Sequence, residues 1–136
     1  MSFDEVFAAL KPVLTPYAGR LSVREKPGEY HLETKTAIYK GRPMMFAAVR
    51  TGKAYVSFHL MPIYMNPKLQ ASISSELKKR MQGKSCFNFT RVEPSHIAEL
   101  KKLTKAGFEQ FKKLASAAHG PLDILLNEPV TKLAVR

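Results

Sequence analysis

Hydrophobic and polar residues alternate through much of the first half of the chain, and three short turns divide this stretch into strand-like segments. The segments are rich in β-branched and aromatic residues, which suit the pleated surface of a sheet: LSVRE at 21–25, YHLETKTAIY at 30–39, MMFAAV at 44–49 and AYVSFHL at 54–60. The turns between them, at 26–29, 40–43 and 50–53, contain glycine or proline. Turns this short leave no room for a crossover helix, so the pattern predicts an antiparallel meander.

Helical patterns flank this predicted sheet. Ser2 and Glu5 form a capping box before a first helix whose apolar residues share one face, and Pro12 predicts a kink or break within it. A second helix is predicted over about 67–81, with Gly83 as its stop. A fifth strand is expected at 86–89 and a third helix from about 93–95 to 118. The apolar segment at 122–135 is expected to pack back on the domain.

The third helix has two distinct halves. One half carries the apolar side of the wheel, made of Ile97, Leu100, Leu103, Thr104, Phe108, Phe111, Leu114 and Ala115, and the other carries Lys101, Lys102, Lys105, Lys112 and Lys113. The lysines are either a solvated face or a basic stripe that follows a phosphate backbone. Together these patterns predict one α+β domain over 1–136, with a single antiparallel sheet of about five strands flanked by three helices.

Composition and charge narrow the class of protein. A length of 136 residues suits one domain, and a hydrophobic fraction of 45% argues against wholesale disorder. The net charge of +11 indicates either a basic but otherwise ordinary surface or an anionic partner such as nucleic acid. The single cysteine, the acidic N-terminal segment and the lack of a long apolar run predict a cytoplasmic protein that is not associated with a membrane.

No motif in the sequence indicates catalysis, a metal site or a cofactor. The acidic residues are scattered, and no pair has a spacing that forces two carboxylates into one site. The four histidines and Cys86 lack metal-ligand spacing. The chain has neither a glycine-rich phosphate loop nor a nucleophile elbow. We therefore predict a protein without catalytic residues, metal ligands or cofactors.

Two sets of residues are candidates for binding. Alternation in the fourth segment places Tyr55, Ser57 and His59 on one sheet face, although either face could be the core. Aromatic and methionine residues at the exit of this strand can line an adaptable pocket for a small molecule. The ligand candidates are Tyr55, His59, Met61, Tyr64, Lys84 and Cys86, and the nucleic-acid candidates are Lys78, Lys79, Arg80, Lys101, Lys105 and Lys112. Cys86 is expected to be a buried small apolar side chain, and His59 a structural histidine.

Three stretches of the chain resemble a known family. The segments IYKGRPMMFAAV at 38–49, AYVSFHLMP at 54–62 and SELKKRMQGKSCFNF at 75–89 look like the YdhG-like family of bacterial domains of unknown function. This family includes proteins described as frataxin-like intracellular iron chaperones, and the resemblance implies an α+β domain. Iron handling of that kind depends on clustered carboxylates, whereas the only adjacent acids here are Asp4 and Glu5.

These features lead to one expected function with two alternatives. We expect a small non-enzymatic binding or accessory domain whose ligand the sequence does not identify. The first alternative is nonspecific nucleic-acid binding through the basic surface. The second is a frataxin-like iron chaperone, which the net positive charge disfavours because it repels cations.

Overall fold

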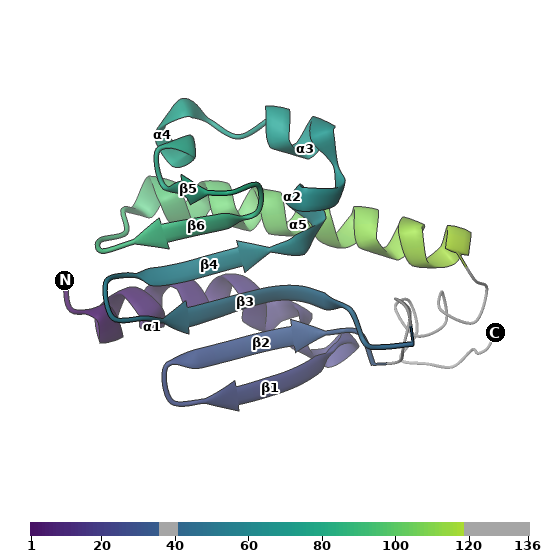
Figure 1. The fold of residues 1–136 in the computed structure, drawn as a ribbon, viewed down its shortest axis with the longest axis horizontal. Coiled ribbons are helices and arrows are strands. Elements are labelled where there is room, and N and C mark those ends of the chain that lie inside the picture. Colours follow the sequence, from purple (N-terminus) through teal and green to yellow (C-terminus); the bar gives the residue numbers. More distant parts are fainter. Residues whose placement is uncertain (36–40, 119–136) are drawn as a thin grey trace.

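The strands form one antiparallel sheet in the order β1-β2-β3-β4-β6-β5 (Figure 1). The computed structural model describes residues 1–35 and 41–118. The strands are β1 (Ser22–Lys26), β2 (Glu29–Glu33), β3 (Met45–Thr51), β4 (Val56–Leu60), β5 (Met81–Gln82) and β6 (Cys86–Phe89). The first four follow one another as a meander, as the turn pattern predicted.

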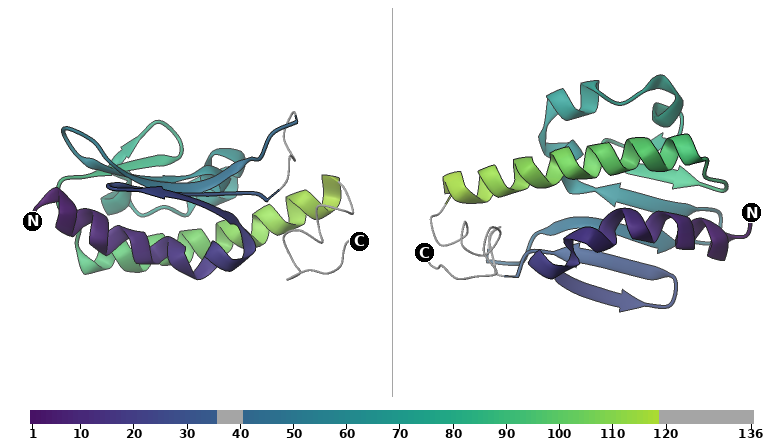
Figure 2. Two further views of the ribbon diagram at one scale, coloured as in Figure 1. Left: turned by 90° about the horizontal axis from the view of Figure 1, so that it is seen from below. Right: turned by 180° about the vertical axis from the view of Figure 1, so that it is seen from behind.

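Two long helices cover one face of this sheet. Both α1 (Phe3–Leu14) and α5 (Pro94–Ala118) lie on the same side, and no described element covers the opposite face (Figure 2). A 3-10 helix, η1 (Thr15–Arg20), joins α1 to β1. Three short helices follow β4, namely α2 (Met61–Met65), α3 (Pro67–Ala71) and α4 (Ser75–Lys78). Figure 1 shows α3 and α4 beyond the β5 edge of the sheet. No helix in the described part of the chain combines the length and apolarity needed to cross a membrane.

The core lies between the sheet and the two long helices. In β4, the fully buried side chains of Val56, Phe58 and Leu60 alternate with Ser57 and His59, which are only partly buried. The alternation therefore places the first three on the helix side and the other two on the open side. Of the two faces that the sequence left open, the one with Val56, Phe58 and Leu60 therefore packs in the core.

A β-bulge changes the alternation in β3. Leu32 pairs with Ala47, but its neighbour Glu33 pairs with Met45, so Phe46 is the extra residue on the bulged strand. Both Phe46 and Ala47 are therefore buried, although they are consecutive. The Phe46 ring lies in the core against rings from η1 and α5.

The capping box predicted for the first helix is confirmed. The Ser2 hydroxyl accepts the backbone N–H of Glu5, and the Glu5 carboxylate accepts the N–H of Ser2. These hydrogen bonds lower the pKa of Glu5. No break occurs at Pro12, since α1 continues to Leu14 before the backbone tightens into η1.

The predicted α+β class, with a single antiparallel sheet beside helices, is confirmed, but the described residues form six strands and five α-helices where five strands and three helices were predicted, and α2 was not predicted. The prediction of a single helix over 67–81 is wrong, because the segment forms two separate helices, α3 and α4. Ser72 and Ile73 lie between them without helical structure, and Ser74 caps the second helix. The end of that segment forms the short strand β5, which adds a sixth strand where five were predicted. The predictions for 36–40 and 122–135 lie outside the described residues.

Candidate ligand-binding groove

A groove with a volume of about 480 Å³ lies between α3, α4 and the turn that joins β5 to β6. Its apolar lining comes from α3, from the loop before α4 and from β5, and its cationic lining comes from α4 and the turn. The lining residues are Pro67, Gln70, Ala71, Ile73, Lys78, Met81, Gly83 and Lys84. The volume falls in the range that small-molecule sites in proteins occupy, roughly 300–1,000 Å³.

The α3 wall of the groove is fixed by short-range polar contacts. Pro67 stands at the start of α3, where a helix tolerates proline, and the Asn66 side chain caps the helix by accepting the N–H of Lys68. The Gln70 amide nitrogen donates to the carbonyl of Ile63, 2.9 Å away. These contacts tie α3 to α2 and hold the Gln70 side chain at the groove.

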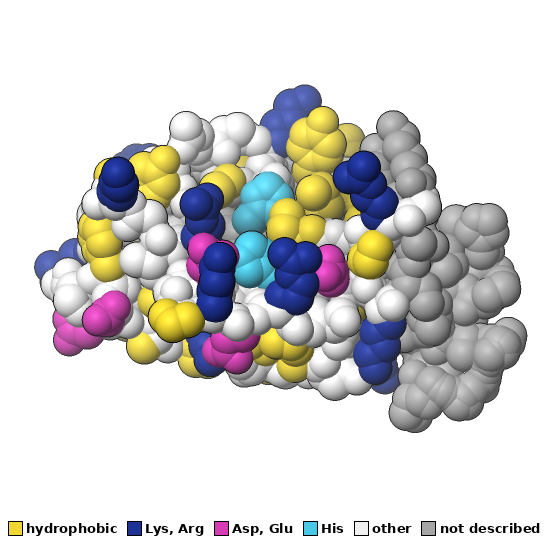
Figure 3. Space-filling model, turned by 60° about the horizontal axis from the view of Figure 1, so that its bottom comes forward, with side chains coloured by type: hydrophobic (Ala, Val, Ile, Leu, Met, Phe, Trp, Pro, Cys, Tyr) yellow, Lys and Arg dark blue, Asp and Glu magenta, His cyan; other side chains and the backbone are white. Residues whose placement is uncertain are grey.

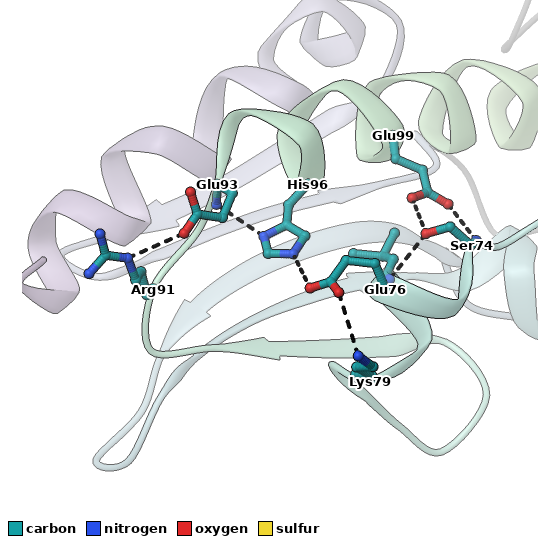
Figure 4. Close-up of polar contacts among 8 residues, drawn as sticks. Ser74, Glu76, Lys79, Arg91, Glu93, His96 and Glu99 are labelled. Carbon is teal, nitrogen blue, oxygen red and sulfur yellow. Dashed lines mark hydrogen bonds and ion pairs between the residues drawn. The ribbon is translucent and has the colours of Figure 1, made fainter.

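The α4 wall is held by contacts with α5 (Figure 4). The Glu99 carboxylate accepts both the backbone N–H and the hydroxyl of Ser74, at 2.7 and 2.6 Å. The same hydroxyl accepts the N–H of Leu77 and so caps α4. Because the cap of this very short helix depends on a carboxylate 25 residues away in sequence, tertiary structure decides where α4 begins.

A buried histidine makes the second connection between α5 and α4. His96 is 2% exposed, and its Nδ1 accepts the backbone N–H of Glu93 at 3.0 Å. The ring proton therefore lies on Nε2, which faces the Glu76 carboxylate at 3.4 Å. The other Glu76 oxygen pairs with Lys79 (Figure 4). These polar contacts give His96 a structural role at the start of α5.

Two neighbouring lysines at the end of α4 have different surroundings. Lys79 is paired with Glu76, whereas Lys78 lines the groove and has no ion-pair partner among the described residues. Gly83 has a φ of 74°, the left-handed conformation that glycine adopts without strain, and the residue after this turn, Lys84, also lines the groove. Lys84 also has no partner in the described part of the chain. The groove thus combines an apolar lining with two uncompensated cations.

The open face of the sheet carries a row of polar side chains. Cross-strand pairing places His31, Ala48, His59 and Cys86 side by side on successive strands. Ala48 is only 6% exposed although no described helix covers this face, so neighbouring side chains shield it. Figure 3 shows two histidine side chains together here, with basic and acidic side chains around them.

The groups on this face are held by hydrogen bonds between side chains. His59 Nε2 lies 3.3 Å from the Ser85 hydroxyl, and burial lowers the pKa of His59. Ser57 donates to Asn88 at 2.9 Å, and Asn88 in turn donates to Gln82 at 2.7 Å. Ser85 is 6% exposed and so presents little surface to a substrate, which gives the serine–histidine contact a structural role.

Cys86 is half-buried on this open face, so the expectation of a buried small apolar side chain was only partly right. Its thiol is directed at the Asn88 carbonyl oxygen 3.6 Å away, and burial raises its pKa. The thiolate is the reactive form, and a raised pKa means that less of it is present at a given pH.

We expect slow labelling of Cys86 by iodoacetamide in the native protein at pH 8, and severalfold faster labelling in urea, which removes the burial. The native rate should keep rising with pH above the range where the unfolded rate levels off. Because the chain has one cysteine, the total rate reports this thiol alone. Equal rates in the native and unfolded states would contradict the assignment.

The structure distributes the predicted nucleic-acid residues over two separate places. Glu99 and Gly107 of α5 face α4 and α2, where they lie against Ser74 and Pro62. At 100° per residue, the line through Lys101, Lys105 and Lys112 lies on the opposite flank of α5. The basic residues at and just after the end of α4, Lys78, Lys79 and Arg80, therefore do not join these lysines in one surface.

The ligand candidates predicted from the sequence are also separated. Lys84 lines the groove, whereas His59 and Cys86 lie on the open sheet face. The Tyr55 hydroxyl reaches the same face by donating to Gln82 at 3.3 Å. Met61 and Tyr64 belong to α2, and Tyr64 is exposed.

The sequence reasoning did not identify the apolar lining of the groove, which includes Ile73 and Met81. One signal could have indicated its location. Ser74 followed by the acid Glu76 is a helix start within the segment that was predicted as one continuous helix.

Within residues 1–35 and 41–118, the histidine, cysteine and acidic side chains do not gather in threes around a point where a metal ion could bind. Comparisons with family models, curated proteins and solved structures found no significant match to this chain. The YdhG-like resemblance and the iron chaperone that it implies therefore stay predictions.

Proposed function

We propose that this protein is a non-enzymatic binding domain that takes a small ligand in the groove between α3, α4 and the β5–β6 turn. The groove itself is the observation that supports this proposal. It combines an apolar lining with polar groups at defined positions, as ligand sites in proteins do. Its walls are fixed by the Asn66 cap on one side and by the Ser74–Glu99 contacts on the other. A site with fixed walls loses little conformational entropy when a ligand binds.

Filling the groove should block binding. Ala71 is exposed at the end of α3 and lines the groove, so Ala71→Phe places an aromatic ring in the ligand's space without disturbing the core. We expect the wild type to bind Nile red, a neutral apolar dye, and the variant to bind it about tenfold more weakly. A tenfold loss of affinity is the binding free energy that roughly 55 Å² of buried apolar surface supplies. Fluorescence titration of the dye measures the effect.

Ala106→Phe is the matched control, because Ala106 is an exposed helical alanine that does not line the groove. Its affinity for the dye should equal that of the wild type. The proposal fails if the wild type does not bind the dye. It also fails if both phenylalanine variants bind equally well, since the dye would then bind elsewhere.

A second candidate function is nonspecific nucleic-acid binding by the lysine face of α5. The described residues of that face include Lys101, Lys102, Lys105, Lys112 and Lys113, with Glu109 as the acid among them. Glu109 pairs with Lys112 at 3.5 Å, and the other four lysines have no ion-pair partner in the described part of the chain. Phosphate contacts made by such a face carry no base information.

For this second function we expect a dissociation constant of roughly 1–100 μM for unrelated DNA and RNA oligonucleotides at physiological salt. Each phosphate contact to duplex DNA should contribute a slope of about −0.9 to the salt dependence, which fluorescence anisotropy can measure. A triple variant should flatten that slope, with Gln in place of Lys101, Lys105 and Lys112. The same replacement at Lys26, Lys53 and Lys68 keeps the net charge equal and should leave the slope steeper. Equal slopes in the two triple variants would remove this function from consideration.

A further inference from the structure

The charged residues of the groove are all of one sign. Lys78 projects from α4 and Lys84 from the β5–β6 turn, and no acidic side chain is part of the lining. Glu76, the acid of α4, is already engaged by His96 and Lys79. The groove therefore offers two ammonium groups to a ligand and no carboxylate that would compete with it.

The rest of the lining is suited to an apolar chain. Ile73 is 4% exposed and so forms the floor of the groove with little accessible surface, whereas Met81 is partly buried against the core and presents more apolar surface. Pro67 and Ala71 extend this surface along α3. Lysine side chains also contribute, because their methylene stems can lie along apolar surface while the ammonium group stays in water. A ligand in this groove would contact hydrocarbon along its length and cations at the rim.

We propose that the groove binds a small amphipathic monoanion, an unbranched apolar chain that ends in a carboxylate. This inference rests on the proposed function, since it names the class of ligand for the same groove. The carboxylate lies between the ammonium groups of Lys78 and Lys84, and the chain lies along Ala71 and Met81. Each methylene that becomes fully buried increases affinity by about fourfold, so the chain supplies affinity and the two lysines select the anion.

Three probes with the same eight-carbon chain separate these contributions. Equilibrium dialysis with radiolabelled octanoate, octan-1-ol and octylammonium measures the affinity of each one directly. We expect octanoate to bind about fivefold more tightly than octan-1-ol, because two partly exposed ion pairs each contribute modestly. Octylammonium should bind most weakly, since its charge meets two like charges.

The variant Lys78→Gln/Lys84→Gln should lose about fivefold in octanoate affinity and keep its affinity for octan-1-ol within about twofold. The control Lys53→Gln/Lys68→Gln removes the same net charge at two exposed positions outside the groove lining. It should bind octanoate as the wild type does. All four side chains are exposed, so neither variant is expected to unfold the protein.

Four results would overturn the inference. Equal affinity for octanoate and octan-1-ol would show an apolar groove without anion selection, and the proposed function would stand. An equal loss in the control variant would show that net charge rather than the groove attracts octanoate. Absence of octanoate binding in a protein that binds Nile red would exclude this ligand class but leave the groove as a site. Absence of binding for all of these probes would remove the proposed function as well.

Discussion

Phe46→Ala should lower the free energy of unfolding by about 3–5 kcal/mol, the usual cost of removing a buried phenylalanine ring. Phe46 is fully buried, and its ring centroid lies 5.9, 5.6 and 5.4 Å from those of Tyr17, Phe108 and Phe111. The substitution removes these contacts and leaves a cavity among three elements that cannot all close over it. The loss is large against the total stability of an ordinary domain, about 5–15 kcal/mol.

Urea denaturation followed by circular dichroism at 222 nm measures this effect, because the chain has no tryptophan to report it. Phe46→Leu keeps most of the apolar volume and should cost less. Tyr64→Ala is the control, since this aromatic side chain is 59% exposed, and its stability should stay within about 0.5 kcal/mol of the wild type. If Phe46→Ala cost no more than Tyr64→Ala, the place of Phe46 in the core would be wrong.

Gly107→Leu should destabilise the protein by about 1–3 kcal/mol, even though leucine favours helices far more than glycine does. Gly107 lies inside α5 where the helix passes close to α2. A Cβ atom at this position would lie 2.9 Å from the Cβ of Pro62 and 3.1 Å from its Cγ. Both atoms belong to the rigid ring of a buried residue, so the neighbour cannot give way easily.

Ala106→Leu is the control for this substitution, because it adds a leucine at the next, exposed position of the same helix. It should leave the free energy of unfolding within about 0.5 kcal/mol of the wild type. Gly107→Ala tests the same contact with a smaller side chain. Helix propensity alone predicts that this change raises the free energy of unfolding by about 1 kcal/mol, and the close contact with Pro62 should cancel that increase. A full gain for Gly107→Ala would contradict the close approach of α2 and α5.

Sequence patterns predicted the elements that depend on local chemistry. The Ser2–Glu5 capping box, the turns of the meander and the amphipathic pattern of α5 are all encoded within a few residues. The observed elements follow these predictions because turn and cap residues act on their immediate neighbours. The burial of Phe46 could not be read from alternation, since the bulge that turns it inward is a feature of pairing between strands.

The groove was missed because tertiary contacts form it. The segment from 67 to 81 has enough helical character to be predicted as one helix, but Glu99 of α5 supplies the partner that lets Ser74 start a second one. Lys78 and Lys84 were assigned to different roles in the sequence, and the β5–β6 turn brings them to one groove. Their shared site depends on where Gly83 turns the chain.

The most direct test of the central claim, that this groove binds the ligand, is a titration of the ¹⁵N-labelled protein with octanoate followed by two-dimensional NMR. Backbone amides at the groove, those of Gln70, Ala71, Ile73, Met81 and Lys84, should show the largest shift changes. Amides of the lysine face of α5 and of the open sheet face should change little. The largest changes on either of those surfaces, with an unchanged groove, would contradict the account.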